Sequence, residues 1–147
     1  MNAIALYRLG HWCHDRRIPL VPRLVRILLF LVYNSVIPVT AQIGEGTTFG
    51  WGGVGVALHP ECRIGRNVRI GLQVTIGGRS RRAGVPRIED DCIIGAGARI
   101  LGPIRVGKGS AIGANAVVLE DVPPGCAVAG IPARIVRSNI DIRDYWA

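Results

Sequence analysis

The chain has 147 residues, the length of about one domain. Apolar residues make up 49% and charged residues 19%, so the composition is that of a folded protein and excludes a disordered segment. Aromatic residues are only 5%, whereas glycine occurs 20 times. Because glycine suits tight corners and few bulky rings are available to fill a core, this composition favours a β-rich fold over a helical bundle.

The charge balance is strongly basic, with 18 lysines and arginines against 10 acids and a net charge of +8. Lys108 is the only lysine. Arginine binds phosphates and carboxylates well, so we expect anionic partners. Charge alone does not distinguish a nucleic acid, a membrane surface and a phosphorylated cofactor. The arginine-rich segment 78–87 contains no aromatic residue, so we do not expect a nucleic-acid partner.

Residues 1–38 are expected to form a short helical cap. Their beginning lacks the signal-peptide order of basic, apolar and small residues, so we expect a cytoplasmic protein. The apolar run 27–39 is too short to span a membrane, which takes about 20 residues. It follows several arginines (Arg16, Arg17, Arg23 and Arg26), so an interfacial helix at the inner membrane face is an alternative to a cap packed on the main fold.

The four cysteines (Cys13, Cys62, Cys92 and Cys126) contain no CxxC pair. Cys62 and Cys92 fall in apolar patterns, which predicts buried thiols in a reducing compartment. His11, Cys13 and His14 lie close together, but their spacing matches no structural zinc pattern and no second ligand pair follows. We therefore expect no metal.

An internal repeat of six residues is the most informative feature. Large aliphatic residues recur at this interval, with one doubled step after Ile76: Leu58, Ile64, Ile70, Ile76, Ile88, Ile94, Ile100, Val106, Ile112 and Val118. Glycine follows many of them, and a small or branched residue stands four positions later. A period of six fits neither a helix nor one long strand, but it fits a coil of short strands joined by corners. Three strands per turn give about 18 residues per coil and about five coils between Ile43 and Val136.

Several stretches carry a family resemblance: Ile64-Gly-Arg-Asn-Val, Ile94-Gly-Ala-Gly-Ala, Val106-Gly-Lys-Gly and Ile112-Gly-Ala-Asn-Ala-Val-Val. They resemble the hexapeptide-repeat acyltransferases. The resemblance implies an all-β fold, a left-handed parallel β-helix, and a homotrimer. We place the helical cap at 1–38, the β-helix at 39–137 with an excursion at 78–87, and a tail at 138–147.

Four further motifs make this resemblance more specific: Val74-Thr-Ile-Gly-Gly, Gly84-Val-Pro-Arg-Ile, Val122-Pro-Pro-Gly and Ala129-Gly-Ile-Pro-Ala-Arg134-Ile-Val. These motifs resemble serine acetyltransferases and relatives that O-acetylate capsular or exopolysaccharide sugars. The chain departs from the former where it has Trp51-Gly52 in place of an Asp-His pair and Val85 in place of a second histidine. These departures argue against L-serine as the acceptor.

Acetyl transfer to a hydroxyl needs a base, and histidine is the usual one. His59 stands in the repeat region at a corner where most repeats have glycine, and departures of this kind are often functional. We predict that His59 is the catalytic base; an exposed corner histidine is the alternative. Glu61 is the nearest acid that could orient its ring, and Glu89, Asp90 and Asp91 could approach from another coil or subunit.

The remaining predicted site residues bind the substrates. The resemblance implies that acetyl-CoA, the expected co-substrate, contacts the double glycine, the corner alanines and two basic side chains: Gly77, Gly78, Ala96, Ala114, Lys108 and Arg134. The arginines of the excursion and Trp51 are predicted to contact the acceptor: Arg79, Arg81, Arg82, Arg87 and Trp51. The alternatives are a solvated loop and simple packing at the corners.

The sequence therefore predicts an acetyl-CoA-dependent O-acetyltransferase that modifies a sugar hydroxyl in polysaccharide biosynthesis, with a nucleotide- or lipid-linked glycan as acceptor. Serine O-acetyltransferase is the nearest enzymatic alternative. The alternative to an enzyme is a non-catalytic β-helix that serves as a scaffold. A scaffold of this kind would have no affinity for CoA.

Overall fold

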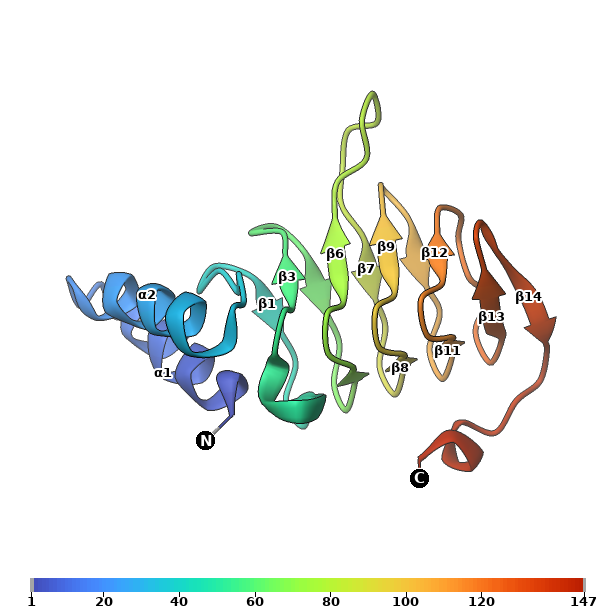
Figure 1. Ribbon diagram of the computed structural model, residues 1–147, viewed down its shortest axis with the longest axis horizontal. Coiled ribbons are helices and arrows are strands. Elements are labelled where there is room, and N and C mark those ends of the chain that lie inside the picture. The colour runs from blue at the N-terminus through green and yellow to red at the C-terminus, as the bar shows by residue number, and fades with distance from the viewer. Residues whose placement is uncertain (1, 147) are drawn as a thin grey trace.

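A computed structural model describes residues 2–146 (Figure 1). A helical hairpin lies at one end, and a regular solenoid of short strands extends from it toward a terminal hairpin and tail. The solenoid is the left-handed parallel β-helix that the family resemblance implies. Each run of six residues supplies one strand and one corner, because the inward side chain fixes the strand and the residues after it turn the chain.

The strands stack into three sheets, parallel except for the last strand of face 2, and these sheets form the three faces of the solenoid. Face 1 contains β1 (Gln42–Ile43), β4 (Arg63–Ile64), β7 (Arg87–Ile88) and β10 (Arg105–Val106). Face 2 contains β2 (Thr48–Phe49), β5 (Arg69–Ile70), β8 (Ile93–Ile94), β11 (Ala111–Ile112), β13 (Ala127–Gly130) and β14 (Ala133–Arg137). Face 3 contains β3 (Ala57–Leu58), β6 (Thr75–Gly77), β9 (Arg99–Leu101) and β12 (Val117–Val118).

The register shows the coil length directly. Leu58 of β3 pairs with Ile76 of β6, so one coil advances 18 residues, as predicted. Four coils carry a strand on every face, and Val122 and β13 begin a fifth. The solenoid is therefore slightly shorter than the five coils expected, because β14 turns back and pairs with β13 in the antiparallel direction.

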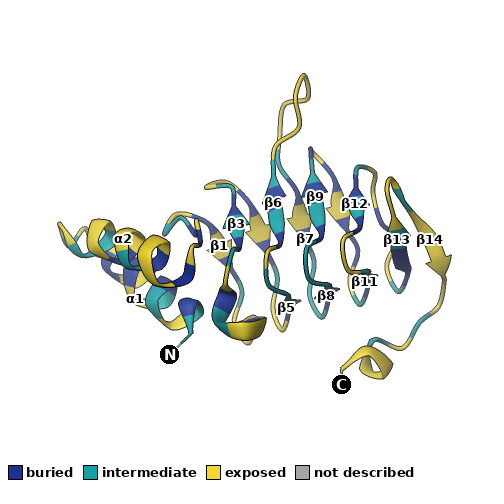
Figure 2. Ribbon diagram, in the orientation of Figure 1, coloured by how far each residue is buried: buried dark blue, intermediate teal, exposed yellow. Residues whose placement is uncertain are grey.

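The core is a continuous cluster of mostly aliphatic side chains along the solenoid. Figure 2 shows buried residues on the strands of successive coils. The predicted six-residue series is buried at every position from Leu58 to Val118. The small or branched residues four positions later are buried as well: Cys62, Val68, Val74, Cys92, Ala98, Ile104, Ser110, Ala116 and Val122. Cys62 and Cys92 are buried free thiols, as the sequence predicted, and Cys13 and Cys126 are buried and free as well.

The corners explain why glycine follows the inward residues. A Cβ on Gly65 would lie 2.7 Å from Asp90 N and 2.8 Å from Glu89 C in the next coil, so a side chain there has no room. The left-handed turn comes two residues later, at Asn67, with φ of 54°. Asparagine tolerates this conformation better than most residues. Glycine therefore serves close packing of successive coils at Gly65, and the turn itself depends on a different residue.

One interruption of the six-residue pattern has its own support. The 3₁₀ helix η1 (Gly50–Gly53) lengthens the first coil between β2 and β3. The buried Ser35 hydroxyl donates to Gly53 O at 2.5 Å and accepts the Val56 N–H at 3.2 Å. This serine fastens the insertion to the segment that leads in from the helices.

The helical hairpin consists of α1 (Ala3–Asp15) and α2 (Val21–Tyr33). Helix α1 lies against the first coil, where Arg8 donates to Ile43 O at 2.6 Å and to Gly44 O at 2.5 Å. Tyr7 donates to Ala41 O at 2.5 Å, and His11 Nδ1 donates to Val39 O at 2.6 Å. These side chains satisfy backbone carbonyls at an edge that would otherwise remain open to pairing.

Two segments leave the solenoid. The excursion between β6 and β7 projects away from it, and a 3₁₀ helix η2 (Ile142–Tyr145) lies in the tail after β14 (Figure 1). Within residues 2–146, no helix is both long and apolar enough to cross a bilayer.

Candidate active site

His59 lies at the corner between β3 and β4, where the chain passes from face 3 to face 1. Its backbone N–H donates to Ile76 O at 2.9 Å, so His59 lies beside Gly77 of the following coil. A Cβ on Gly77 or Gly78 would meet nothing within 4 Å, which leaves open space next to the histidine. The predicted base and the predicted cofactor glycines are therefore neighbours.

The backbone N–H of Glu61, and not its carboxylate, orients the His59 ring. His59 Nδ1 accepts the Glu61 N–H at 3.2 Å, so the neutral ring carries its proton on Nε2. The side chain of Glu89 is engaged elsewhere: Arg105 Nε donates to Glu89 Oε1 at 2.8 Å and the Lys108 N–H donates to Oε2 at 2.8 Å. The hydrogen bonds from Arg105 and Lys108 hold the pKa of Glu89 below its usual range.

The other two acids weighed as partners of His59 also bind elsewhere. Asp90 accepts the Arg66 N–H at 2.8 Å, and Asp91 accepts from Asn67 at 3.1 Å. Both contacts lie at the corner between faces 1 and 2, so these carboxylates serve the packing of successive coils.

A polar cleft of about 570 Å³ has Pro60 and Glu61, the two residues after His59, in its wall, whereas His59 itself does not line it. Its walls come from the corner after β3, the foot of the excursion and the segment before β1: Thr40, Gln42, Pro60, Glu61, Cys62, Arg63, Val85 and Arg87. The exposed side chains of Glu61, Arg63 and Arg87 place one negative and two positive charges around this space. The cleft can thus receive a small ligand that carries charges of both signs.

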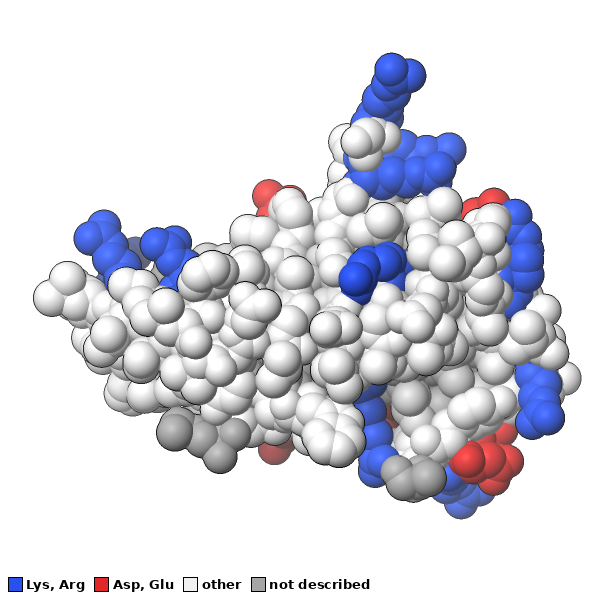
Figure 3. All heavy atoms as spheres, in the orientation of Figure 1, with Lys and Arg blue, Asp and Glu red and all other residues white. Residues whose placement is uncertain are grey.

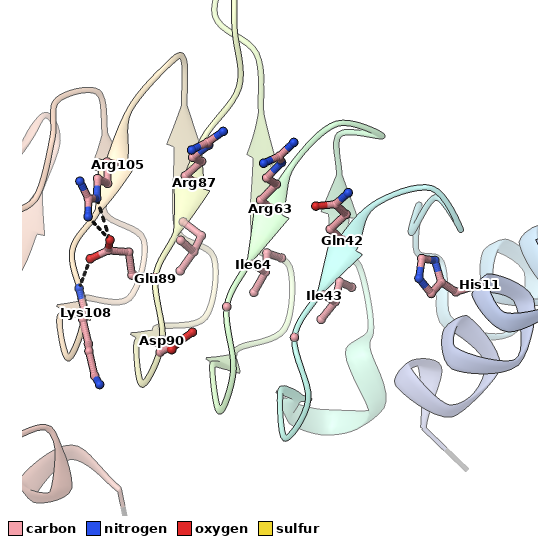
Figure 4. A pocket seen from close by; sticks show the side chains of 13 residues that line it. His11, Gln42, Ile43, Arg63, Ile64, Arg87, Glu89, Asp90, Arg105 and Lys108 are labelled. Atoms are coloured by element: carbon pink, nitrogen blue, oxygen red, sulfur yellow. Dashed lines mark hydrogen bonds and ion pairs between the residues drawn. The ribbon is translucent and has the colours of Figure 1, made fainter. Parts of the chain in front are cut away.

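Arg63 and Arg87 form the cationic wall of this cleft. They pair in register on β4 and β7, and their side chains point the same way (Figure 4). The next arginine along face 1, Arg105, is bound to Glu89, whereas neither Arg63 nor Arg87 takes part in an ion pair among residues 2–146. Two adjacent guanidinium groups without an internal counter-ion suit a carboxylate or phosphate.

These arginines also line a larger groove of about 680 Å³ that runs along face 1 from His11 to Lys108 (Figure 4). Sequence reasoning named Arg87 but missed Arg63. The missed signal was the recurring Arg-Ile pair, since Arg63 stands before Ile64 as Arg87 stands before Ile88. Residues that precede an inward isoleucine point outward, so two of them in neighbouring coils lie side by side.

The excursion carries its arginines into solvent. Arg79, Arg81 and Arg82 are exposed, and Arg79 forms an isolated antiparallel bridge with Arg82. Basic side chains cover the projecting tip in the space-filling view (Figure 3). No described contact fixes these three side chains to the cleft, so their role as acceptor contacts stays a prediction.

The other predicted contacts lie elsewhere on a single chain. Ala96 and Ala114 occupy successive coils of the corner between faces 2 and 3, and Trp51 lies at the same corner in the first coil. Trp51 and Ala96 line a separate groove of about 640 Å³ on face 2, which also includes Trp146 of the tail. One chain therefore does not bring these residues together with His59.

The two basic residues expected to bind CoA phosphates are engaged with acids. Lys108 Nζ lies 3.5 Å from Asp91 Oδ2, at the corner between faces 1 and 2. Arg134 of β14 lies 3.9 Å from Glu120 Oε2. Both side chains are mostly exposed, so these ion pairs are weak enough to yield to a ligand phosphate.

Residues 2–146 contain no group of three histidine, cysteine, aspartate or glutamate side chains arranged to hold a metal ion. In the His11, Cys13 and His14 segment, His11 packs on the solenoid through Val39 O, and its Nε2 lies 3.5 Å from Asp15. Cys13 is a buried residue of α1.

Comparisons with known proteins agree with this architecture. The family model described as Bacterial transferase hexapeptide (six repeats) matches residues 86–120. A serine acetyltransferase from Bacillus subtilis is 39% identical over 141 residues, which cover 95% of this chain and 64% of that protein. The chain thus spans about 60% of the length of such relatives.

Solved structures give the same result. A serine acetyltransferase from Brucella abortus in complex with coenzyme A superposes with a TM-score of 0.85 at 34% identity, covering 92% of this chain and 55% of that one. A soybean serine acetyltransferase complexed with serine has a TM-score of 0.82 at 39% identity, covering 91% and 56%.

These findings correct the acceptor predicted from the sequence. The relatives that match over almost the whole chain are named serine acetyltransferases, so the prediction of a sugar hydroxyl in polysaccharide biosynthesis, with a glycan acceptor, is wrong. The prediction of a sugar acceptor rested on three positions, Trp51, Gly52 and Val85, at which the chain differs from serine acetyltransferases. The sequence pattern did not predict the charged cleft lined by Glu61, Arg63 and Arg87. The chain is therefore similar to the bacterial hexapeptide transferases at residues 86–120 and to serine acetyltransferases over about 95% of its length.

Proposed function

We propose that this protein is a serine O-acetyltransferase that transfers the acetyl group of acetyl-CoA to the hydroxyl of L-serine. The cleft whose wall includes Pro60 and Glu61, the two residues after His59, carries the proposal. A free amino acid presents an α-carboxylate and an α-ammonium group, and Arg63 with Arg87 matches the first while Glu61 matches the second. The similarity to serine acetyltransferases over 95% of the chain supports the same acceptor.

The proposed reaction is a direct transfer. The serine hydroxyl oxygen attacks the thioester carbonyl, His59 takes the hydroxyl proton, and the tetrahedral intermediate collapses to O-acetylserine and the CoA thiolate, which is then protonated. In the observed rotamer the basic nitrogen, Nδ1, faces the Glu61 N–H. The ring has to turn and release this one long hydrogen bond before Nδ1 reaches the substrate.

The acetyl-CoA arm fits the open space at Gly77 and Gly78. Both glycines leave the backbone accessible, and Gly77 is the immediate neighbour of His59 in the next coil. We also propose a homotrimer, in which the face 2 groove of one subunit, with Trp51 and Ala96, completes the site of another. Sedimentation of the purified protein tests the oligomeric state.

The test measures CoA release from acetyl-CoA with L-serine as acceptor and L-alanine, which lacks the hydroxyl, as the negative control. We expect His59→Ala to lower kcat at least 100-fold, since general-base catalysis contributes about 10²–10⁴-fold. Glu61→Ala keeps the backbone N–H, so it should raise the KM for L-serine with a smaller change in kcat. Arg63→Gln should raise that KM about tenfold, whereas Arg66→Gln, outside the cleft, should leave it unchanged.

Two results would overturn different parts of the proposal, the acceptor in one case and the enzymatic activity in the other. Saturable acetyl-CoA binding in a calorimetric titration without L-serine turnover would reject serine as the acceptor and keep the donor. Absence of binding at several times a typical KM, on the order of a millimolar, would reject the enzyme and leave the non-catalytic scaffold.

A further inference from the structure

Helix α2 has two apolar faces, and only one of them is covered. Val25, Leu29 and Tyr33 are buried against α1 and the solenoid end. On the opposite side, large apolar side chains recur at intervals of four and three residues and are exposed; we call this set the α2 outer face: Leu20, Leu24, Ile27, Phe30 and Leu31. Leu20 and Leu31 are each 72% exposed. A contiguous apolar face exposed on a helix marks a surface that binds a partner or a membrane, so this face requires an occupant.

The outer face is hollowed as well as apolar. A cavity of about 300 Å³ is lined by Ile27, Phe30, Leu31 and Val36 together with Arg26 and Ser35. In the space-filling view, uncharged surface covers the helical end, with basic side chains gathered along one edge (Figure 3). The arrangement is an apolar surface bordered by positive charge.

The charges around this face have one sign. Residues 2–36 contain five arginines and a single acid, Asp15, which faces His11. Arg16, Arg17, Arg23 and Arg26 are all exposed, and none of them forms an ion pair within the described part of the chain. Arg16 lies over the ring of Trp12, 4.0 Å from its centroid, and Trp12 is itself 49% exposed. Exposed tryptophan beside arginine is typical of side chains placed at a membrane interface.

We propose that the α2 outer face binds the surface of an anionic lipid bilayer. Arginine guanidinium groups would contact lipid phosphates while Leu24, Ile27 and Leu31 enter the headgroup and acyl-chain boundary. Helix α2 has 13 residues and is about 20 Å long, shorter than the hydrocarbon core of about 30 Å, so it lies along the surface. A second copy of the chain is a poorer occupant, because it would bring two sets of unpaired arginines together. The proposal does not depend on the acetyltransferase activity.

Cosedimentation with vesicles tests the proposal. The full chain should bind vesicles that contain about one third phosphatidylglycerol much more strongly than vesicles of phosphatidylcholine alone, and rising salt should weaken the binding. The variant Leu24→Glu/Leu31→Glu should lower the partition coefficient more than tenfold. Its matched control is Ile135→Glu/Val136→Glu, which makes the same change at two exposed apolar residues of β14 at the other end of the solenoid.

A second pair of variants separates location from net charge. Arg16→Gln/Arg17→Gln/Arg23→Gln should weaken binding about fivefold per arginine. Arg79→Gln/Arg81→Gln/Arg82→Gln removes the same charge from the excursion and should change it little. Equal losses in the two variants would overturn the proposal, since they would indicate attraction by net charge alone.

Tryptophan fluorescence provides a readout that does not require a variant of α2. In Trp51→Phe/Trp146→Phe, the remaining Trp12 should be quenched by lipids with brominated acyl chains. Absence of quenching, or of vesicle binding by the unmodified chain, would overturn the proposal. So would a larger oligomer that Leu24→Glu/Leu31→Glu dissociates without any lipid binding, which would assign the face to a second copy.

Discussion

Gly65 and Gly77 each follow an inward isoleucine, yet the two positions have different surroundings. A Cβ on Gly65 would enter the backbone of the next coil at Asp90, whereas a Cβ on Gly77 would enter open space beside His59. Gly65 is therefore required for packing, and Gly77 is free to serve a ligand. The repeat pattern alone treats them as equivalent.

We expect Gly65→Ala to lower the free energy of unfolding by about 1–3 kcal/mol, because the added methyl group forces two coils apart. Gly77→Ala should change it by less than about 0.5 kcal/mol, the usual range for a surface substitution. The same Gly77→Ala should weaken acetyl-CoA binding about tenfold, since the methyl group occupies the space proposed for the pantetheine arm. Urea unfolding and calorimetric titration measure the two quantities. Equal stability losses would contradict the packing difference.

At the scale of the strands and corners, the six-residue period predicted the core because each strand buries one aliphatic side chain and the pattern repeats without regard to distant residues. A coil length of 18 residues also implies that His59 and Gly77 are neighbours in successive coils, because they are 18 residues apart. The cleft at Arg63, Val85 and Arg87 was not predictable in the same way. It depends on how the excursion leaves and rejoins the solenoid, and no local pattern fixes that path.

Buried thiols in two corners make the solenoid sensitive to alkali. Burial raises the pKa of Cys62 to about 12 and that of Cys92 to about 11, and it raises the pKa of Tyr7 to about 12. An unfolded thiol titrates near pH 8.5 and an unfolded tyrosine near pH 10. Between these values and the folded pKa values, the folded chain holds protons that the unfolded chain has released, so the free energy of unfolding falls as pH rises.

We expect the free energy of unfolding to change little between about pH 6 and pH 8 and to fall steadily from about pH 9 to pH 11. In Cys62→Ala/Cys92→Ala the stability at pH 8 should be lower, because two buried side chains lose volume, but its decline with pH should be shallower. Urea unfolding at a series of pH values gives both slopes. Parallel curves for the two proteins would show that these thiols do not cause the loss.

At the scale of the whole molecule, the chain is a column of coils in which each coil contacts only its neighbours. Its first coil has no preceding strand on face 1, and α1 takes that place through Tyr7, Arg8 and His11. These contacts join residues 28 to 35 positions apart, so the six-residue pattern does not predict them. The same hairpin presents the α2 outer face, so one element both closes the solenoid and offers a surface to lipid.

A substitution at Arg8 tests how many coils the contacts of α1 with the first coil stabilise. We expect Arg8→Gln to lower the free energy of unfolding by about 1.5–3 kcal/mol, because it removes charge-assisted hydrogen bonds to Ile43 O and Gly44 O. Hydrogen exchange should quicken at the amides of β1 and β2 and stay unchanged at β11 and β12, since stability in a solenoid is passed only between adjacent coils. Arg66→Gln, an exposed arginine on the second coil, is the matched control and should alter neither. Faster exchange along the entire solenoid would mean instead that the coils unfold as a single cooperative unit and that α1 stabilises all of them.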